Sequence, residues 1–357
     1  MKILIAGDWH SDLHEEPVYR SLVQLGHEVV AFPWFRYFRT APGPLNGALS
    51  LLKRAENKYL VGPDLARLNA DLLALIARQQ PAAVLVYRGT HIHARTLRRM
   101  RQAAPRSVLA GYNNDDPFAP NQFPRLFRHF LEGVPEYDVI LAYRHRNLED
   151  YRRAGARRVE LLRSWFVPER NHHVHLGPTE REAYECDVAF VGHYENDGRV
   201  EHLEAVLQRG WRLRLYGPDW NGVIPASSPL ARLGPIRAVW GEEYNKALCG
   251  AKIALCFLSK LNRDTYTRRC FEIPATRTMM VSEYSEDLAG LYQPGVEAEF
   301  FLGKDDMLRK IERYLADDAL RVSVAERGWR RVHAGGHDVV SRMRQLVTQL
   351  EAISLSK

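Results

Sequence analysis

The sequence has 357 residues, about twice the usual size of a single domain, so two domains are expected. Hydrophobic residues make up 46% of the chain and charged residues 26%, which excludes wholesale disorder and a small disulfide scaffold. The net charge of +7 is compatible with an anionic partner without requiring one. The chain turns polar after Gly7, and no segment has the roughly 20 apolar residues of a membrane span, so a cytoplasmic protein is expected.

Short apolar runs that alternate with helical patterns predict a parallel α/β domain over residues 1–165. Residues 2–6 and 28–32 are strand-like, and residues 15–25 between them have apolar side chains at helical spacing. This order of strand, helix and strand is typical of a parallel sheet with right-handed crossovers. Further strands are predicted at 83–87, 108–111 and 139–143, and further helices at 65–78, 94–103 and 147–154.

Residues 166–186 are polar, show no clear period and are predicted to link two domains. His172, His173 and His175 lie there, and a solvated connection explains them better than a metal site, because no thiol or acid accompanies them. A second α/β domain is predicted over 187–336, with strands at 187–191, 213–216, 251–257 and 279–282 and helices at 200–208 and 267–276. Residues 337–357 are predicted to form an amphipathic helix.

Two α/β domains in tandem predict a cleft, because each sheet binds ligands at the carboxyl ends of its strands. In the first domain, His10 and Asp12 follow the first strand, and Asp115 and Asp116 follow the fourth. Each of these four side chains is a candidate general base. The composition around Asp115 and Asp116 also fits a turn that lines the cleft, and this is the preferred interpretation.

In the second domain, Gly192 begins a polar loop that ends at Arg199, at the start of a predicted helix. The loop lacks the full G-x-G-x-x-G pattern and the Walker lysine, so neither a dinucleotide nor an ATP fingerprint is met. A strand, a small-residue turn and a helix N-terminus still offer backbone N–H groups to a phosphate. Any α/β unit needs such a turn, so the loop alone does not decide between structure and function.

A charged segment precedes and enters the predicted helix at 267–276. Arg268, Arg269 and Glu272 are three and four positions apart, so Glu272 shares a helical face with at least one arginine. A carboxylate can hold a ribose diol through two hydrogen bonds, while a guanidinium binds a diphosphate. An ordinary salt bridge on a solvated helix is the alternative. The apolar residues on both sides of this segment favour a position of the charged residues at the carboxyl ends of the strands.

The sequence Thr267-Arg-Arg-Cys-Phe-Glu-Ile-Pro-Ala275, followed by Met280-Val-Ser-Glu283 and Phe300-Phe301, resembles the C-terminal domain of CgeB-like glycosyltransferases. The segments Asp187–Gly192 and Leu215–Trp220 are similar to that domain's opening strands. The resemblance implies the GT-B architecture, with two Rossmann-like domains facing across a cleft. It also implies that the C-terminal helix crosses back to the N-terminal domain.

The resemblance also implies site residues. In the wider retaining GT-B group, two glutamates eight positions apart hold the sugar nucleotide. Glu272 matches the second glutamate, which binds the ribose, and the shorter Asp264 stands at the first position. Gly192 is on the donor-binding loop, and Arg199 with Arg268 or Arg269 are the implied diphosphate ligands. Fixed cations can stabilise the departing diphosphate in place of Mg²⁺, so a metal-independent enzyme without cofactors is expected.

We therefore expect a glycosyltransferase that moves a sugar from a nucleoside diphosphate sugar to a glycan, a lipid-linked or a small-molecule acceptor. Retention of configuration is expected, and inversion stays open. A GT-B epimerase or phosphorylase, and a non-catalytic nucleotide-sugar-binding scaffold, are the alternatives. Nucleic acid is not expected as a partner, because stacking aromatics are scarce near the arginine-rich stretches 95–101 and 144–158. Those stretches are either solvated faces or peripheral contacts with the inner membrane face.

Overall fold

The computed structural model describes residues 1–40, 47–120, 122–123 and 125–355. The chain divides into two compact units. The first unit combines Met1–Ser164 with Val339–Lys357, and the second is Trp165–Asp338. Residues 166–186, which the sequence presents as a linker, are therefore part of the second unit, where they include the helix α7 (Pro178–Tyr184).

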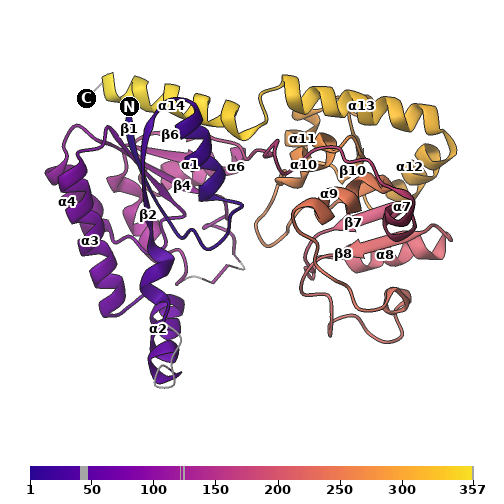
Figure 1. Ribbon diagram of the computed structural model, residues 1–357, viewed down its shortest axis with the longest axis horizontal. Helices are drawn as coiled ribbons and strands as arrows, with labels where there is room; N and C mark the ends of the chain where they lie inside the picture. Colours follow the sequence, from indigo (N-terminus) through magenta and orange to yellow (C-terminus); the bar gives the residue numbers. More distant parts are fainter. Residues whose placement is uncertain (41–46, 121, 124, 356–357) are drawn as a thin grey trace. The chain divides into compact units, whose positions relative to one another are not determined.

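The first unit is built on a six-stranded parallel sheet in the order β2-β1-β3-β4-β5-β6 (Figure 1). Its strands are β1 (Lys2–Gly7), β2 (Glu28–Pro33), β3 (Ala83–Tyr87), β4 (Val108–Asn113), β5 (Val139–Ala142) and β6 (Val159–Leu161). Its helices are α1 (Glu15–Gln24), α2 (Gly47–Tyr59), α3 (Pro63–Gln79), α4 (Ala94–Ala103), α5 (Arg128–Gly133), α6 (His145–Arg153) and α14 (Val339–Leu355).

Both faces of this sheet are covered by helices, as its strands require. Leu4 of β1 belongs to a buried cluster with residues of α3 and α4, whereas its neighbours Ile3 and Ile5 are fully buried on the other face. Helices α1 and α14 lie side by side in this unit (Figure 1). This contact confirms the prediction that the C-terminal helix returns to the N-terminal domain.

The second unit contains a five-stranded parallel sheet in the order β11-β10-β9-β7-β8. Its strands are β7 (Cys186–Val191), β8 (Leu213–Tyr216), β9 (Ala251–Cys256), β10 (Met279–Glu283) and β11 (Glu299–Phe301). In addition to α7, its helices are α8 (Arg199–Gln208), α9 (Glu242–Cys249), α10 (Arg269–Ala275), α11 (Glu286–Leu291), α12 (Lys304–Ala316) and α13 (Asp318–Ala334). The two parallel sheets confirm the predicted pair of α/β domains.

The direction in which strands are added reverses once in each sheet. In the second unit, β8 lies on one side of β7 and the later β9 lies on the other side. In the first unit, the same reversal occurs between β1 and β3. Open parallel sheets bind ligands outside the carboxyl ends of the strands at such a reversal. The topology therefore directs the search for a site to the loops after β7 and β9, and to those after β1 and β3.

Candidate functional site

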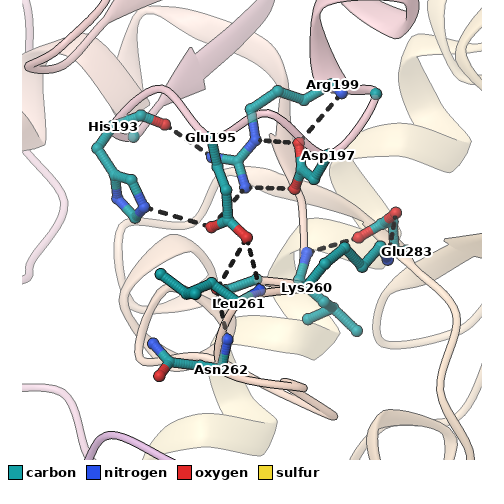
Figure 2. A network of polar contacts seen from close by, with 12 residues as sticks. His193, Glu195, Asp197, Arg199, Lys260, Leu261, Asn262 and Glu283 are labelled. Carbon is teal, nitrogen blue, oxygen red and sulfur yellow. Dashed lines mark hydrogen bonds and ion pairs between the residues drawn. The ribbon is translucent and has the colours of Figure 1, made fainter. Parts of the chain in front are cut away.

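The loop after β7 is held in shape by a buried ion pair (Figure 2). The guanidinium of Arg199, at the start of α8, donates to both carboxylate oxygens of Asp197, from Nε at 2.8 Å and from Nη2 at 2.6 Å. Its Nη1 donates to the carbonyl of His193 at 2.7 Å. The side chains of Arg199 and Asp197 are only 3% and 2% exposed. These contacts give Arg199 a structural role in the loop, and they leave its predicted role as a diphosphate ligand without support.

Glu195 joins this loop to the loop after β9 (Figure 2). Its Oε1 accepts hydrogen bonds from the Ser259 hydroxyl at 3.1 Å and from the Leu261 N–H at 2.9 Å. Burial alone would raise the pKa of Glu195, but hydrogen bonds from His193, Leu261 and Ser259, with the charge of Arg199, lower it to about 2. The carboxylate is therefore ionised at neutral pH and connects the two loops at the topological reversal.

A second carboxylate holds the same loop from the neighbouring strand. Glu283, the last residue of β10, accepts the Leu258 N–H at 2.6 Å and the Lys260 ammonium at 3.0 Å. Residues 258–261 are thus held by Glu195 on the β7 side and by Glu283 on the β10 side. Sequence analysis assigned no role to Glu195 or to Glu283, which ends a motif of the resemblance. Both come after a predicted strand, and this position could have indicated them.

Gly192 lies where the loops after β7 and β8 meet. Its N–H donates to Tyr216 at 2.8 Å, and its carbonyl accepts from the indole of Trp220 at 2.8 Å. A Cβ atom on Gly217 would lie 1.9 Å from this carbonyl oxygen, and Gly217 has a φ of +144°. Only glycine can occupy position 217 while the backbone of Gly192 keeps this place.

Helix α10 carries two of the predicted donor ligands, Arg269 and Glu272. Arg269 donates from Nε to the carbonyl of Val191 at 2.7 Å, so its side chain reaches the carboxyl end of β7. Glu272 lies one turn into the helix, and its Oε2 accepts the hydroxyl of Tyr244 at 2.8 Å. Burial, followed by the charge of Glu272, raises the pKa of Tyr244 well above its usual value, so the hydroxyl keeps its proton and donates it.

The remaining donor candidates flank α10. Asp264 lies in the loop after β9, where its backbone N–H donates to the carbonyl of Ser259 at 2.8 Å. Arg268 directly precedes α10, and its carbonyl accepts from Phe271 and Glu272, which closes the first turn. All five donor candidates therefore lie at the carboxyl ends of the strands. They are Gly192, Asp264, Arg268, Arg269 and Glu272. Tyr244, which orients Glu272, is 28 residues away in sequence and was not anticipated.

The candidate residues of the first unit are at the carboxyl ends of β1 and β4. Asp12 is exposed, and His10 pairs through Nδ1 with Asp8 at 2.9 Å while its side chain remains 57% exposed. Asp115 forms an ion pair with Arg88 at 2.7 Å.

Asp116 is completely buried and accepts from the Asn147 amide at 2.9 Å and from the Phe118 N–H at 3.0 Å. The contact with the Phe118 N–H, two residues on, is that of an Asx turn, and it supports the turn interpretation over the catalytic base for Asp116.

A buried carboxylate fills the loop after β1. Glu15, at the start of α1, is 2% exposed and accepts the N–H of Asp8 at 2.9 Å. Burial raises the pKa of Glu15, although backbone N–H groups of the same loop partly offset this. A side chain at Gly7 would clash with this carboxylate at 2.5 Å. The loop that would otherwise offer its N–H groups to an anion is thus filled by a carboxyl group of its own chain.

Within residues 1–40, 47–120, 122–123 and 125–355, no three His, Cys, Asp or Glu side chains gather as ligands for a metal ion. Over the same ranges, none of the helices is long and apolar enough to cross a bilayer.

Comparisons with known proteins bear on the fold. Residues 199–348 match the family model described as glycosyl transferase-like, and no curated protein matches the sequence significantly. HepE of Anabaena, solved in complex with UDP-glucose, is 13% identical, with a TM-score of 0.68 over 99% of this chain and 100% of that chain. Sucrose-phosphate synthase of Thermosynechococcus elongatus is 14% identical, with a TM-score of 0.68 over 99% of each chain.

A third structure, α,α-trehalose 6-phosphate synthase of Burkholderia multivorans, is 11% identical, with a TM-score of 0.61 over 100% of this chain and 99% of that chain. At these identities the likeness shows the fold, and it confirms the predicted architecture. The chain has the GT-B glycosyltransferase fold from end to end, and its C-terminal part matches a glycosyl transferase-like family model.

Proposed function

We propose that this protein is a glycosyltransferase that transfers a sugar from a nucleoside diphosphate sugar to an acceptor hydroxyl. The observation that carries the proposal is the position of Glu272 beside Arg269 in α10, at the reversal between β7 and β9. The match of residues 199–348 to the glycosyl transferase-like model supports it, because α10 lies inside the matched range. The resemblance to CgeB-like enzymes remains our proposal for the subfamily.

In this proposal, each group binds a separate part of the donor. Glu272 would bind the ribose diol through its carboxylate, which Tyr244 orients from one side. Arg269 and Arg268 would bind the diphosphate, with the backbone at Gly192 approaching it closely. Arg199 contributes by shaping the loop, since its guanidinium is already paired with Asp197. UDP-glucose is the first donor to test, because HepE was solved with it.

We further propose that the reaction needs no metal ion and retains the configuration of the sugar. Fixed guanidinium groups can stabilise the negative charge that develops on the leaving diphosphate. In a retaining reaction the leaving phosphate can itself take the acceptor proton. This agrees with the contacts of Asp115 and Asp116, which are engaged by Arg88 and Asn147. The acceptor would be a glycan, a lipid-linked sugar or a small molecule.

Calorimetry with UDP, GDP, dTDP and CMP tests donor binding, and one nucleotide should bind with micromolar affinity. Glu272→Ala should weaken that binding about 10- to 100-fold, because a charged hydrogen bond is worth ~1.5–3 kcal/mol. Tyr244→Phe should weaken it less, since the carboxylate itself remains. Glu312→Ala, which removes an exposed carboxylate of α12 in the same unit, is the matched control and should leave the affinity unchanged.

Turnover is then measured as release of the nucleotide from its sugar conjugate in the presence of candidate acceptors. Activity should persist in EDTA, and a requirement for added Mg²⁺ would contradict metal independence. Folded protein that binds none of the four nucleotides would refute the proposed donor class. Donor binding without turnover across a broad set of acceptors would favour the non-catalytic scaffold.

A further inference from the structure

A cavity of about 580 Å³ opens at the amino ends of the strands of the second unit's sheet, whereas the donor loops follow their carboxyl ends. Cys186, Ala251 and Met279, the first residues of β7, β9 and β10, line it. A strand of six residues, such as β7, is about 20 Å long, so the cavity is well separated from Gly192 at the other end. Its volume is within the range of small-molecule sites.

Cationic side chains dominate the charged lining of this cavity. Five of them line it together with two carboxylates, Glu185 and Glu326, and two imidazoles. Two of the five are paired outside the lining, Lys252 with Asp187 at 2.9 Å and Arg321 with Asp318. The guanidinium of Arg212 is exposed and forms no ion pair with any residue that the structure describes. The cations are Arg181, Arg212, Lys252, Arg277 and Arg321, and the imidazoles are His173 and His175.

Arg277, one of the lining residues, is held in an unusual backbone conformation. Its φ is +59°, which residues other than glycine adopt rarely and usually where function or packing requires it. Its guanidinium lies 4.3 Å from the centre of the Trp329 ring and 3.5 Å from Glu326. The ring fixes the plane of the guanidinium, which lowers the entropy that Arg277 would lose on binding an anion.

The lining also limits the kind of anion. It contains no Phe, Tyr or Trp side chain, so a nucleobase would find no ring to stack on. Thr276, Thr278 and Cys249 also line it, with the two threonine hydroxyls buried and donating to the carbonyls of Ile273 and Leu248. Guanidinium and ammonium groups with small polar neighbours are suited to phosphate and to the hydroxyls of a polyol.

We propose that this cavity binds a phosphate ester that carries no nucleobase, at a site separate from the donor site. Among the described residues, it is formed by α7 with the segment 173–176 before it, by the first residues of β7, β9 and β10, by Arg212 before β8, and by residues of α9, α13 and the chain between α10 and β10. The proposal uses none of the groups assigned to the nucleotide, so it does not depend on the proposed transfer reaction.

Cys249 provides a local reporter for the test. It is the partly exposed one of the four free cysteines, and the other three are buried. Its thiol lies 3.7 Å from Nδ1 of His173, inside the cavity. Alkylation of Cys249 by the neutral reagent iodoacetamide is followed by peptide mass spectrometry, with inorganic phosphate and inorganic pyrophosphate as probes. We expect pyrophosphate to slow the alkylation at least ~5-fold in a saturable way, and phosphate to act at higher concentration.

Arg212→Gln should raise the half-protecting concentration of pyrophosphate about tenfold, the effect of losing one charged contact. Arg309→Gln removes an exposed arginine of α12 outside the cavity and should leave that concentration unchanged. Arg277→Gln serves as a second cavity variant if the first is poorly folded. Glu272→Ala should keep the protection, which separates this site from the donor site.

Three results would each overturn the proposal. The first is no protection by pyrophosphate at up to ~10 mM. The second is equal protection by sodium chloride of matched ionic strength, which would indicate screening rather than binding. The third is an unchanged half-protecting concentration in both Arg212→Gln and Arg277→Gln.

Discussion

Replacing Asp197 by alanine tests whether Arg199 is a structural residue of the loop after β7. Both side chains are almost fully buried, and Asp197 accepts two hydrogen bonds from the guanidinium and a third from the Arg199 backbone N–H. In Asp197→Ala the guanidinium would remain buried with Glu195, 3.3 Å away, as its nearest carboxylate.

Removing one partner of a buried ion pair costs ~3–5 kcal/mol, because the remaining charge has lost both water and its partner. The carboxylate of Glu195 offsets part of this cost, so we expect a loss of about 3 kcal/mol in the unfolding free energy of the second unit. For a unit of this size, ~1 kcal/mol shifts the melting temperature by about 2–4 °C. The expected decrease is therefore about 6–12 °C.

Differential scanning calorimetry of the full chain measures this decrease. Glu242→Ala is the control, because it removes an exposed carboxylate that pairs with Lys246 at 3.4 Å on the surface of α9. Such surface pairs contribute less than ~1 kcal/mol, so the control should melt within about 2 °C of the unaltered protein. If Asp197→Ala melts as the control does, Arg199 does not depend on Asp197, and its guanidinium is available to an external anion.

Two further predictions concern the same loops. Gly217→Ala should lower the melting temperature by at least ~6 °C, because the added Cβ would overlap the Gly192 carbonyl, whereas Gly222→Ala, also at positive φ but with no atom within 4 Å, should cost only the ~1 kcal/mol of backbone strain. Equal melting temperatures for the two variants would contradict this contact. The folded-state pKa of Glu195, about 2, is below its ordinary 4.5, so the stability that this carboxylate contributes is present above pH 4.5 and is lost as the pH falls toward 2. Urea unfolding at pH 7, 5 and 3.5 should show a weaker loss of stability on acidification in Glu195→Gln, and parallel losses would refute the assignment.

The sheets were predictable from the sequence because parallel strands are buried on both faces and appear as short apolar runs. Residues 83–87 and 213–216 form strands with the predicted bounds. Helix α2 was missed because none of its residues is buried, so its sequence carries no pattern imposed by a core. The apolar flanks of the charged segment at 268–272 predicted a position at the end of the sheet, and Arg269 contacts the carbonyl of Val191 at the carboxyl end of β7.

The partners of the site residues could not be predicted, because they depend on which loops meet in space. The ion pair of Arg199 with Asp197 joins residues that are two apart in sequence, yet it forms only when the loop folds back on itself. Tyr244 reaches Glu272 from another helix, and Glu195 reaches Leu261 across 66 residues. Sequence spacing identifies residues of suitable chemistry, and the structure decides which of them are already occupied by the protein itself.

The first unit is discontinuous, since α14 completes it after the whole second unit has been made. At ~5–20 residues per second, synthesis of residues 165–338 takes on the order of ten seconds or more. During that time, the surface of α1 that α14 later covers has no partner from α14. The N-terminal domain therefore cannot complete its native packing during synthesis before the C-terminal domain exists, and a fragment ending at residue 164 would lack a structural helix.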